Sequence, residues 1–276
     1  MLSSSHDFRE RYGQWAIIAG GSEGVGAAAA DMIAGRGINL MVVARDRAKL
    51  DALATDIRSR HTTDIRTISQ DLTAPDAGAR ILAAAAGLEV GLLFYNAGAV
   101  GNSDLFIRQP LSLPLRMIAL NCTTPTVLLH GLAPAMQTRG RGALILVGST
   151  GSFCGGPFTA AYSASKAYQV NLMESLWAEL KDDGVDVLEA VIGSTSTPQR
   201  LRNLGVRANP EMDSTPEEVA AGIIANIANG PTQVFTKGTS GTGPLIKPWS
   251  DFRHLAVNHM IDAHKRFKAR TTPTDR

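Results

Sequence analysis

The sequence of 276 residues has few cysteines, little net charge and no long apolar run, and each shortage excludes a class of protein. Its two cysteines, Cys122 and Cys154, stand far apart, which excludes a disulfide framework and a CxxC metal or redox motif. A near balance of 27 basic and 25 acidic residues gives a net charge of +2. We therefore expect no nucleic-acid partner and no binding to an anionic membrane.

The sequence also lacks the apolar segments that export a chain or anchor it in a membrane. The amino-terminal stretch MLSSSHDFRERYGQ is polar and charged, unlike a signal peptide. The longest mainly apolar stretch, residues 81–101, contains Glu89, Asn96 and four glycines, which is typical of a helix end, a turn and a buried strand. We expect a soluble, cytoplasmic protein, in keeping with the low cysteine content.

What the sequence does contain is the composition of a globular enzyme. It is 44% hydrophobic and 19% charged, and its length suits one large α/β domain with a well-filled core. We expect a single domain over residues 1–276. A substrate loop is expected at about 194–214 and a carboxyl-terminal extension at about 245–276.

Seven short aliphatic or β-branched runs alternate with longer helical patterns. The runs lie at residues 15–20, 38–44, 65–69, 91–96, 143–149, 185–192 and 233–236. Several of them are apolar on both faces, which predicts a parallel sheet covered by helices on either side. In the last helical pattern, Thr215 and Glu218 are spaced as a capping box, Pro216 takes the first helical position and Gly230 follows the end.

A glycine-rich turn, GGSEGVGAAAADM, follows the first predicted strand and opens a helix. Without side chains at Gly20, Gly24 and Gly26, backbone can approach a pyrophosphate closely while helix N-terminal amides point at it. An ordinary tight strand-to-helix turn uses glycines in the same way. The place of this turn after the first strand of a long alternating pattern favours dinucleotide binding.

Arg45 follows the second predicted strand, at the position that reads the adenosine ribose in dinucleotide-binding folds. An Asp there favours a free 2′-hydroxyl, whereas a guanidinium suits a 2′-phosphate. The sequence therefore favours NADP(H) over NAD(H). Two observations oppose this: Arg45 also suits a solvated helix start, and Glu23 in the glycine turn places a negative charge near the expected phosphate.

The stretch AYSASKAYQV places Tyr162 and Lys166 four residues apart, on one face of a helix and within reach of each other. A phenol has a pKa of about 10, so at neutral pH it is a fair acid and a poor base. An adjacent ammonium group favours the phenolate and lowers that pKa. The spacing suits a general acid/base, although a surface helix accommodates the same pair.

Taken in order along the chain, these motifs make the sequence similar to the short-chain dehydrogenase/reductase family over most of its length. The glycine turn resembles the family's TGxxxGxG, with Ala19 in place of the Thr. Residues 95–98, YNAG, resemble its NNAG. Asn121 falls where the family has a catalytic Asn, and Ser149 stands thirteen residues before Tyr162.

The resemblance implies a doubly wound, three-layer α/β/α fold of the Rossmann type, with a parallel sheet of about seven strands in the order 3-2-1-4-5-6-7. It also implies four catalytic residues. Tyr162 is the expected general acid/base, and Ser149 at the end of the fifth strand polarises the substrate oxygen. Lys166 lowers the pKa of Tyr162 and holds the nicotinamide ribose, while Asn121 anchors a water that links Lys166 to solvent.

The resemblance further implies a set of cofactor contacts. Asp71 is expected at the adenine ring and Thr197 at the nicotinamide carboxamide. The family's Pro-Gly after the sixth strand is replaced by Ile192 and Gly193. The full expected set is Gly20, Ser22, Glu23, Gly24, Val25, Gly26, Arg45, Asp71, Leu72, Asn96, Ala97, Gly98, Tyr162, Lys166, Thr195 and Thr197.

The implied activity is an NADP-dependent hydride transfer between nicotinamide and a carbonyl or secondary alcohol. The apolar residues Phe153, Pro157 and Phe158 indicate a fairly apolar substrate. A homodimer or homotetramer is implied as well. The alternative left open is a catalytically silent NADP-binding sensor or scaffold of the same fold, and an epimerase or dehydratase is a lesser one.

No metal is expected in the site. His254, His259 and His264 recur every five residues, which spreads them around a helix instead of forming the i, i+4 pair that a zinc site uses.

Overall fold

The strands form one parallel sheet in the computed structural model, which describes residues 5–98, 104–205, 207–236, 251–255 and 258. The strands are β1 (Trp15–Ala19), β2 (Asn39–Ala44), β3 (Ile65–Ser69), β4 (Val90–Tyr95), β5 (Gly142–Ser149), β6 (Val185–Ile192) and β7 (Thr232–Phe235). Their spatial order is β3-β2-β1-β4-β5-β6-β7. The sequence prediction of strand number, order and direction is confirmed, with every boundary within one residue.

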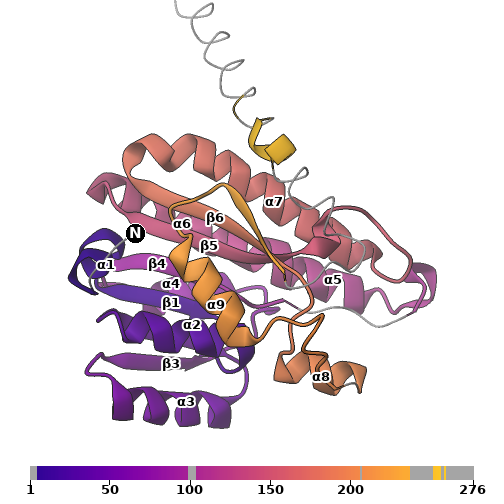
Figure 1. Ribbon diagram of the computed structural model, residues 1–276, viewed down its shortest axis with the longest axis horizontal. Coiled ribbons are helices and arrows are strands. Elements are labelled where there is room, and N and C mark those ends of the chain that lie inside the picture. Colours follow the sequence, from indigo (N-terminus) through magenta and orange to yellow (C-terminus); the bar gives the residue numbers. More distant parts are fainter. Residues whose placement is uncertain (1–4, 99–103, 206, 237–250, 256–257, 259–276) are drawn as a thin grey trace, which may run out of the picture.

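Helices cover both faces of this sheet (Figure 1). They are α1 (Ser5–Tyr12), α2 (Gly24–Ala34), α3 (Arg47–Arg60), α4 (Ala77–Ala84), α5 (Ser112–Ile118), α6 (Thr124–Arg139), α7 (Ala160–Leu180), α8 (Pro198–Leu204) and α9 (Pro216–Ala225). The helices α2, α3 and α9 pack on one face, and α4, α6 and α7 pack on the other. This is the predicted three-layer α/β/α arrangement.

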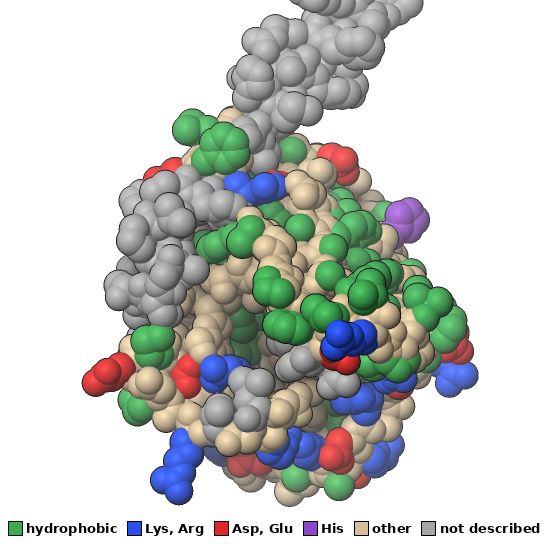
Figure 2. Space-filling view, turned by 90° about the vertical axis from the view of Figure 1, so that its right-hand side faces the viewer, with side chains coloured by type: hydrophobic (Ala, Val, Ile, Leu, Met, Phe, Trp, Pro, Cys, Tyr) green, Lys and Arg blue, Asp and Glu red, His purple; other side chains and the backbone are tan. Residues whose placement is uncertain are grey.

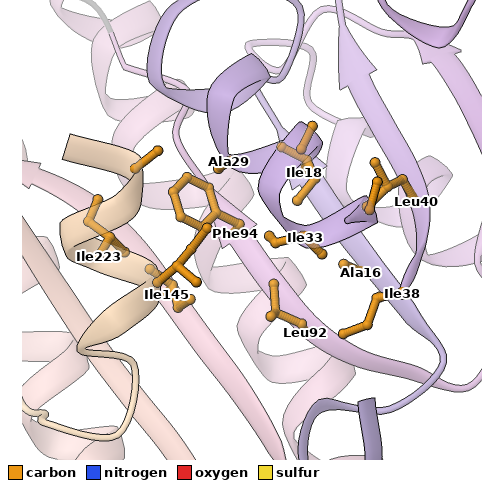
Figure 3. Packing of buried hydrophobic residues seen from close by; sticks show 14 of the residues in the cluster. Ala16, Ile18, Ala29, Ile33, Ile38, Leu40, Leu92, Phe94, Ile145 and Ile223 are labelled. Atoms are coloured by element: carbon orange, nitrogen blue, oxygen red, sulfur yellow. The ribbon is translucent and has the colours of Figure 1, made fainter. Parts of the chain in front are cut away.

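The first hydrophobic cluster fills the space between the sheet and the helices α2, α3 and α9. Figure 3 shows the ring of Phe94 from β4 beside Ile145 from β5 and Ile223 from α9, with Ala29 of α2 close by. All four side chains are fully buried. Since burying a large apolar side chain stabilises a fold by about 1.5–3 kcal/mol, this cluster fixes α2, and with it the glycine turn, against the sheet.

The second cluster lies on the opposite face, under α4, α6 and α7. Its members include Leu128 of α6 and Met173 of α7, which are fully buried against the strands. Tyr95 at the end of β4 is also buried, and its hydroxyl donates a hydrogen bond of 2.6 Å to the backbone oxygen of Leu120. That bond ties the sheet to the short π-helical turn η2 (Ala119–Thr123), which lies between α5 and α6.

Helix α9 begins as the sequence predicts and ends earlier. Thr215 and Glu218 form the capping box in both directions, and Pro216 occupies the first turn. The helix stops at Ala225, so Gly230 is not the residue that follows its end. Gly230 has a packing reason instead, because a Cβ at this position would lie 2.0 Å from the backbone oxygen of Val187.

The carboxyl ends of parallel strands meet at one edge of a sheet, and this edge carries the loops that follow β1, β4, β5 and β6. Helix α8, which follows β6, projects from that end of the molecule in Figure 1. Within the described residues, no helix combines the length and the apolarity that crossing a bilayer requires.

Candidate active site

The glycine turn packs directly against the loop after β4. Gly20 and Gly24 have φ of +78° and +61°, a region that favours glycine. A Cβ on Gly26 would lie 2.2 Å from the backbone oxygen of Gly20, and a Cβ on Gly20 would lie 2.7 Å from the backbone nitrogen of Ala97. The Asn96 amide donates a 3.0 Å hydrogen bond to the same Gly20 oxygen. Two predicted motifs thus form one close-packed unit.

The predicted residues between these glycines have different surroundings. Val25 is buried in the first hydrophobic cluster, so its side chain faces the core and only its backbone can serve a cofactor. Ser22 is half-buried. The cradle leaves no room for side chains at its glycines and opens helix α2, which fits a bound pyrophosphate.

Glu23 is held by two cations. Its carboxylate accepts hydrogen bonds from Lys49 of α3 at 2.7 Å and from Arg202 of α8 at 2.6 Å. Although burial alone favours the neutral acid, these two hydrogen bonds lower the pKa of Glu23. Its negative charge is therefore paired with two positive charges.

A cavity of about 390 Å³ opens beside the ends of β2, β3 and β4. Predicted cofactor residues that line it are Arg45, Asp71, Leu72, Ala97 and Gly98, and other lining residues include Arg116 and Gln199. The four predicted catalytic residues lie outside its lining.

Asp71 is fixed at the mouth of this cavity by its own loop. Its carboxylate accepts hydrogen bonds from the backbone and the hydroxyl of Thr73, at 2.9 and 2.8 Å, and lies 3.6 Å from Arg116. Although burial opposes ionisation, the two bonds from Thr73 lower the pKa of Asp71, so the group is an anion at neutral pH. Asp71 thus presents a fixed acceptor, as a contact to the adenine ring requires.

Ser149 and Tyr162 meet at the carboxyl end of β5. Ser149 is the last residue of the strand and also accepts a 3.1 Å hydrogen bond from the backbone of Gly151. Tyr162, in the first turn of α7, is half-buried. Burial raises the pKa of Tyr162, and its hydrogen bond with Ser149 lowers that pKa only in part.

The raised pKa of Tyr162 differs from the expectation that Lys166 lowers it. Lys166 is 2% exposed, and its Nζ donates to the backbone oxygen of Val147 and to Oε1 of Gln169, both at 2.9 Å. The ammonium is thus engaged with β5 and with its own helix. Burial lowers the pKa of Lys166 to about 8.

Asn121 and Lys166 both form hydrogen bonds with the side chain of Gln169. The backbone oxygen of Asn121 accepts a 2.8 Å hydrogen bond from Nε2 of Gln169, and its side-chain nitrogen donates to Ser165 at 2.9 Å. The Gln169 side chain therefore connects Lys166 to the Asn121 backbone directly. Asn121 stands in the π-helical turn η2, a distortion often found at functional sites.

Gly98 faces this group. A Cβ at Gly98 would lie 3.2 Å from Nζ of Lys166 and 3.6 Å from Oδ1 of Asn121. This oxygen is buried and has no hydrogen-bond partner among the described residues. The YNAG loop after β4 thus joins the predicted cofactor residues to the predicted catalytic ones.

The loop after β6 closes the remaining side of the site. Thr197 caps α8 through its hydroxyl, which accepts from the backbone of Arg200 at 3.3 Å, and its methyl group would lie 3.1 Å from a Cβ on Gly24. Thr195 is buried, and its hydroxyl donates to the Gly193 backbone oxygen at 3.1 Å. Thr197 therefore lies against the glycine turn, whereas Thr195 is occupied within its own loop.

The surface at this end of the molecule is hollowed and partly apolar. Figure 2 shows hydrophobic side chains gathered beside a hollow on this face. Phe158, in the loop between β5 and α7, is 51% exposed, and Met212 after α8 is 36% exposed.

Two polar residues at the site were missed from the sequence. Gln169 and Glu189 are both fully buried, on α7 and β6 respectively. Gln169 stands three residues after Lys166, on the same face of the helix. This spacing could have predicted that the two side chains interact. Glu189 stands between apolar residues in the second half of the strand VDVLEAVI, and this acid in a predicted buried strand was a second indication.

Metal-binding side chains were not expected at this site. Within the described part of the chain, one group of metal-binding type stands close together, His6, Asp7 and Glu10 on α1. It lies at the amino-terminal edge of the sheet, away from the loops that form the site.

Comparison with known proteins gives consistent matches. The sequence profile described as short chain dehydrogenase matches residues 14–203. The chain is 34% identical to a 7beta-hydroxysteroid dehydrogenase of Clostridium sardiniense over 87% of this chain and 89% of the relative. It is 32% identical to a 7beta-hydroxysteroid dehydrogenase of Collinsella aerofaciens, over 72% of this chain and 75% of that one.

Solved structures agree with these matches. One, described for the stereoselectivity of a 7beta-hydroxysteroid dehydrogenase, superposes with a TM-score of 0.78 at 28% identity, covering 95% of this chain and 98% of the other. Another is a short-chain dehydrogenase from Sphingobium yanoikuyae in complex with NADPH, with a TM-score of 0.75 at 26% identity, covering 95% and 97%.

Proposed function

This chain belongs to the short-chain dehydrogenase/reductase family, and from that membership we propose that it transfers hydride between NADP(H) and the carbonyl or secondary alcohol of a fairly apolar substrate. The observation that carries the proposal is that Tyr162 and Ser149 lie side by side at the carboxyl end of β5, one helical turn from Lys166. A Cβ on Gly151 would lie 3.0 Å from Cε1 of Tyr162 and 3.4 Å from Oγ of Ser149. A silent sensor has no need for these three side chains together.

In the proposed reduction, the nicotinamide supplies the hydride when bound, and Tyr162 gives its phenolic proton to the substrate oxygen. Ser149 donates a hydrogen bond to the same oxygen as negative charge grows on it. Oxidation of the alcohol runs in reverse, with the Tyr162 phenolate as the base. Lys166 binds the ribose and, as a cation, stabilises the phenolate.

The proposed cofactor site runs from the glycine cradle to the cavity beside Arg45 and Asp71. The cradle has no space for side chains, and Glu23 is already paired with Lys49 and Arg202. The guanidinium of Arg45 acts on Asp71 electrostatically and has no salt bridge among the described residues, so its charge favours the 2′-phosphate of NADP(H) over the hydroxyl of NAD(H).

Replacing Arg45 with Leu is expected to lower kcat/KM for NADPH by about 10–100-fold, the loss of one or two charge-assisted hydrogen bonds, and to leave kcat/KM for NADH nearly unchanged. Steady-state rates with each cofactor measure this. Arg47→Leu is the matched control, because Arg47 is an exposed neighbour that pairs with Asp51. A parallel fall with both cofactors would contradict the assignment.

The proposed substrate is a secondary alcohol or ketone on a large apolar, ring-bearing skeleton. The exposed Phe158 beside the proposed site supports this, as does the similarity to relatives named 7beta-hydroxysteroid dehydrogenase. A spectrophotometric screen of NADPH oxidation tests it, with hydroxysteroid ketones, bulky cyclic ketones and small aliphatic ketones as separate groups. Turnover confined to the small ketones would overturn the substrate class.

We also propose that the chain is a homodimer or homotetramer. Exposed apolar side chains gather on α5 and its neighbours. Those 37% exposed or more are Leu105, Phe106, Ile107, Leu111, Leu115, Ile118 and Val127. Such a cluster on a surface is typical of an interface between subunits.

Replacing Leu115, which is 54% exposed, with Glu is expected to shift the oligomer toward the monomer, because a buried unpaired carboxylate opposes association. Multi-angle light scattering over a range of protein concentrations measures the mass. Ala52→Glu on the exposed face of α3 is the control and is expected to change nothing. A wild-type mass equal to that of one chain would reject the oligomer.

A further inference from the structure

Glu189 is a buried carboxyl group that the proposed reaction does not use. It lies in β6, is 0% exposed, and neither of its carboxyl oxygens has a hydrogen-bond partner in the described part of the chain. An ionisable side chain buried in this way costs stability unless something compensates. The other acid of this strand, Asp186, is paired with Arg11 and Tyr12, whereas no partner of this kind among the described residues explains the presence of Glu189.

The Glu189 carboxyl group points toward the site because the neighbouring strand β5 has a glycine, and so no side chain, beside it. Glu189 pairs in register with Leu146 of β5, so both side chains point to the face that α6 and α7 cover. Two residues further on, Gly148 has no side chain, and a Cβ there would lie 2.0 Å from Oε1 of Glu189. The carboxyl thus occupies the space beside Gly148, immediately before Ser149.

Lys166 reaches the same place from the helix above. Its ammonium donates to the backbone oxygen of Val147, the residue before Gly148, and acts electrostatically on Glu189 without a hydrogen bond between them. Gln169 bridges Lys166 and the backbone of Asn121, and an amide does not relay protons as a water does. Among the described residues of the sheet, the ionisable group that acts on Lys166 is the Glu189 carboxyl.

Other ionisable groups around this pair are already engaged or act weakly. Glu174 of α7 raises the pKa of Glu189 but is itself paired with Arg253 at 2.6 Å. Cys122 of η2 acts on Lys166, and burial raises the pKa of its thiol, which keeps it neutral. Tyr162 lies one turn away on α7 and is bonded to Ser149. The strands β5 and β7 present no ionisable side chain here.

Burial moves the pKa values of the two groups toward each other. It raises the pKa of Glu189 and lowers that of Lys166, each to about 8, while the attraction between their charges opposes both shifts. The pair therefore binds two protons below that pH and releases one as the pH rises. The positive charge of Lys166 attracts the Glu189 carboxylate, so the proton is released from Glu189 and Lys166 stays charged.

Resting on the proposed function, we propose that Glu189 is a positioning residue for the reaction, whose buried carboxyl gives up its proton in place of Lys166 and so keeps Lys166 an ammonium ion in alkaline solution. Nothing in the reaction passes through Glu189. Its effect reaches the substrate through the charge of Lys166, which stabilises the Tyr162 phenolate.

The kinetic test compares the wild type with Glu189→Gln over pH 6 to 10, in the direction of alcohol oxidation at saturating substrate and NADP. The variant is expected to lose kcat on the alkaline side at a pH at least about one unit lower, a tenfold change in proton affinity, because Lys166 must release its own proton. On the acid side the two profiles are expected to coincide. Coinciding alkaline limbs would overturn the proposal.

A matched control separates this effect from loss of any buried acid. Glu174→Gln removes a buried carboxyl on α7 that has its own partner, and its alkaline limb is expected to stay with the wild type. Should Glu189→Gln fail to fold, Glu189→Met has a similar length, no charge and the same expected alkaline shift. An equal shift in Glu174→Gln would also overturn the proposal.

A second measurement needs neither turnover nor cofactor. Since the folded-state pKa of Glu189 lies above its unfolded value, its contribution to stability is present below the unfolded pKa and is lost as the pH rises to about 8. The melting temperature of Glu189→Gln relative to wild type is therefore expected to rise between pH 5 and 8. In a Lys166→Met background the rise is expected to continue above pH 8, because the carboxyl has lost its cation.

The two outcomes distinguish the inference from the proposed function. A wild type that turns over no alcohol or ketone, with melting curves that change as stated, would reject the function and leave the coupling of Glu189 to Lys166 standing. The wild type could instead be active while the melting difference between Glu189→Gln and wild type changes neither with pH nor in the Lys166→Met background. That result would reject the coupling.

Discussion

Replacement of Tyr162 by Phe is expected to lower kcat by about 100–10,000-fold in both directions, the range that a positioned general acid or base contributes. The ring and its packing remain, and only the hydroxyl bonded to Ser149 is lost. The dissociation constant for NADPH is expected to change by less than about threefold, since Tyr162 neither lines the Arg45 cavity nor contacts the glycines of the cradle. Stopped-flow rates and fluorescence titration measure the two quantities.

The same helix supplies a matched control. Tyr168 is 41% exposed on α7, and its hydroxyl lies 2.7 Å from that of Thr126. Tyr168→Phe removes one phenolic hydroxyl from α7 and is expected to leave kcat within about twofold of wild type. Near-normal turnover in Tyr162→Phe would remove Tyr162 from the reaction, and an equal loss in both variants would point to a structural role for this helix.

Replacement of Gly26 by Ala is expected to weaken NADPH binding by at least about 100-fold and to lower the free energy of unfolding by about 1–3 kcal/mol. The new Cβ would lie 2.2 Å from the Gly20 oxygen and 2.9 Å from Cα of Gly21. Backbone has to move to relieve these contacts, and the Gly20 oxygen also holds the Asn96 amide. One methyl group thus disturbs both the cradle and the loop after β4.

Chemical denaturation and titration with NADPH measure the two losses separately. Gly155→Ala is the control, because a Cβ at Gly155 meets nothing within 4 Å and its backbone needs no left-handed conformation. It is expected to match the wild type in both measurements. A stable Gly26→Ala variant that binds NADPH normally would show that this turn does not carry the diphosphate.

Local patterns in the sequence predicted most of the fold. Each strand is a short run of aliphatic or β-branched residues, with polar residues mixed in only near the sheet edges, so its boundaries came within one residue. The capping box of Thr215 and Glu218 needs only four residues of sequence. The motif spacing likewise brought Asn121, Ser149, Tyr162 and Lys166 into one region. These features depend on residues that are close in the chain, or on motifs whose residue spacing is already known.

The contacts and the burial of those side chains could not be predicted from local sequence patterns. Arg202, which pairs with Glu23, is 179 residues away from it in the chain, and no local pattern reports that contact. The Tyr162 pKa was expected to fall because Lys166 is near, yet burial dominates and raises it. Burial of a given side chain depends on how separate elements pack, which spacing along the chain does not encode.

The space that Gly148 leaves for the Glu189 carboxyl has an evolutionary consequence. A mutation that adds a side chain at position 148 collides with the acid, and one that shortens position 189 opens a void beside the strand. Neither step is neutral unless the other accompanies it. Among descendants of a common ancestor these two positions should therefore change as a pair.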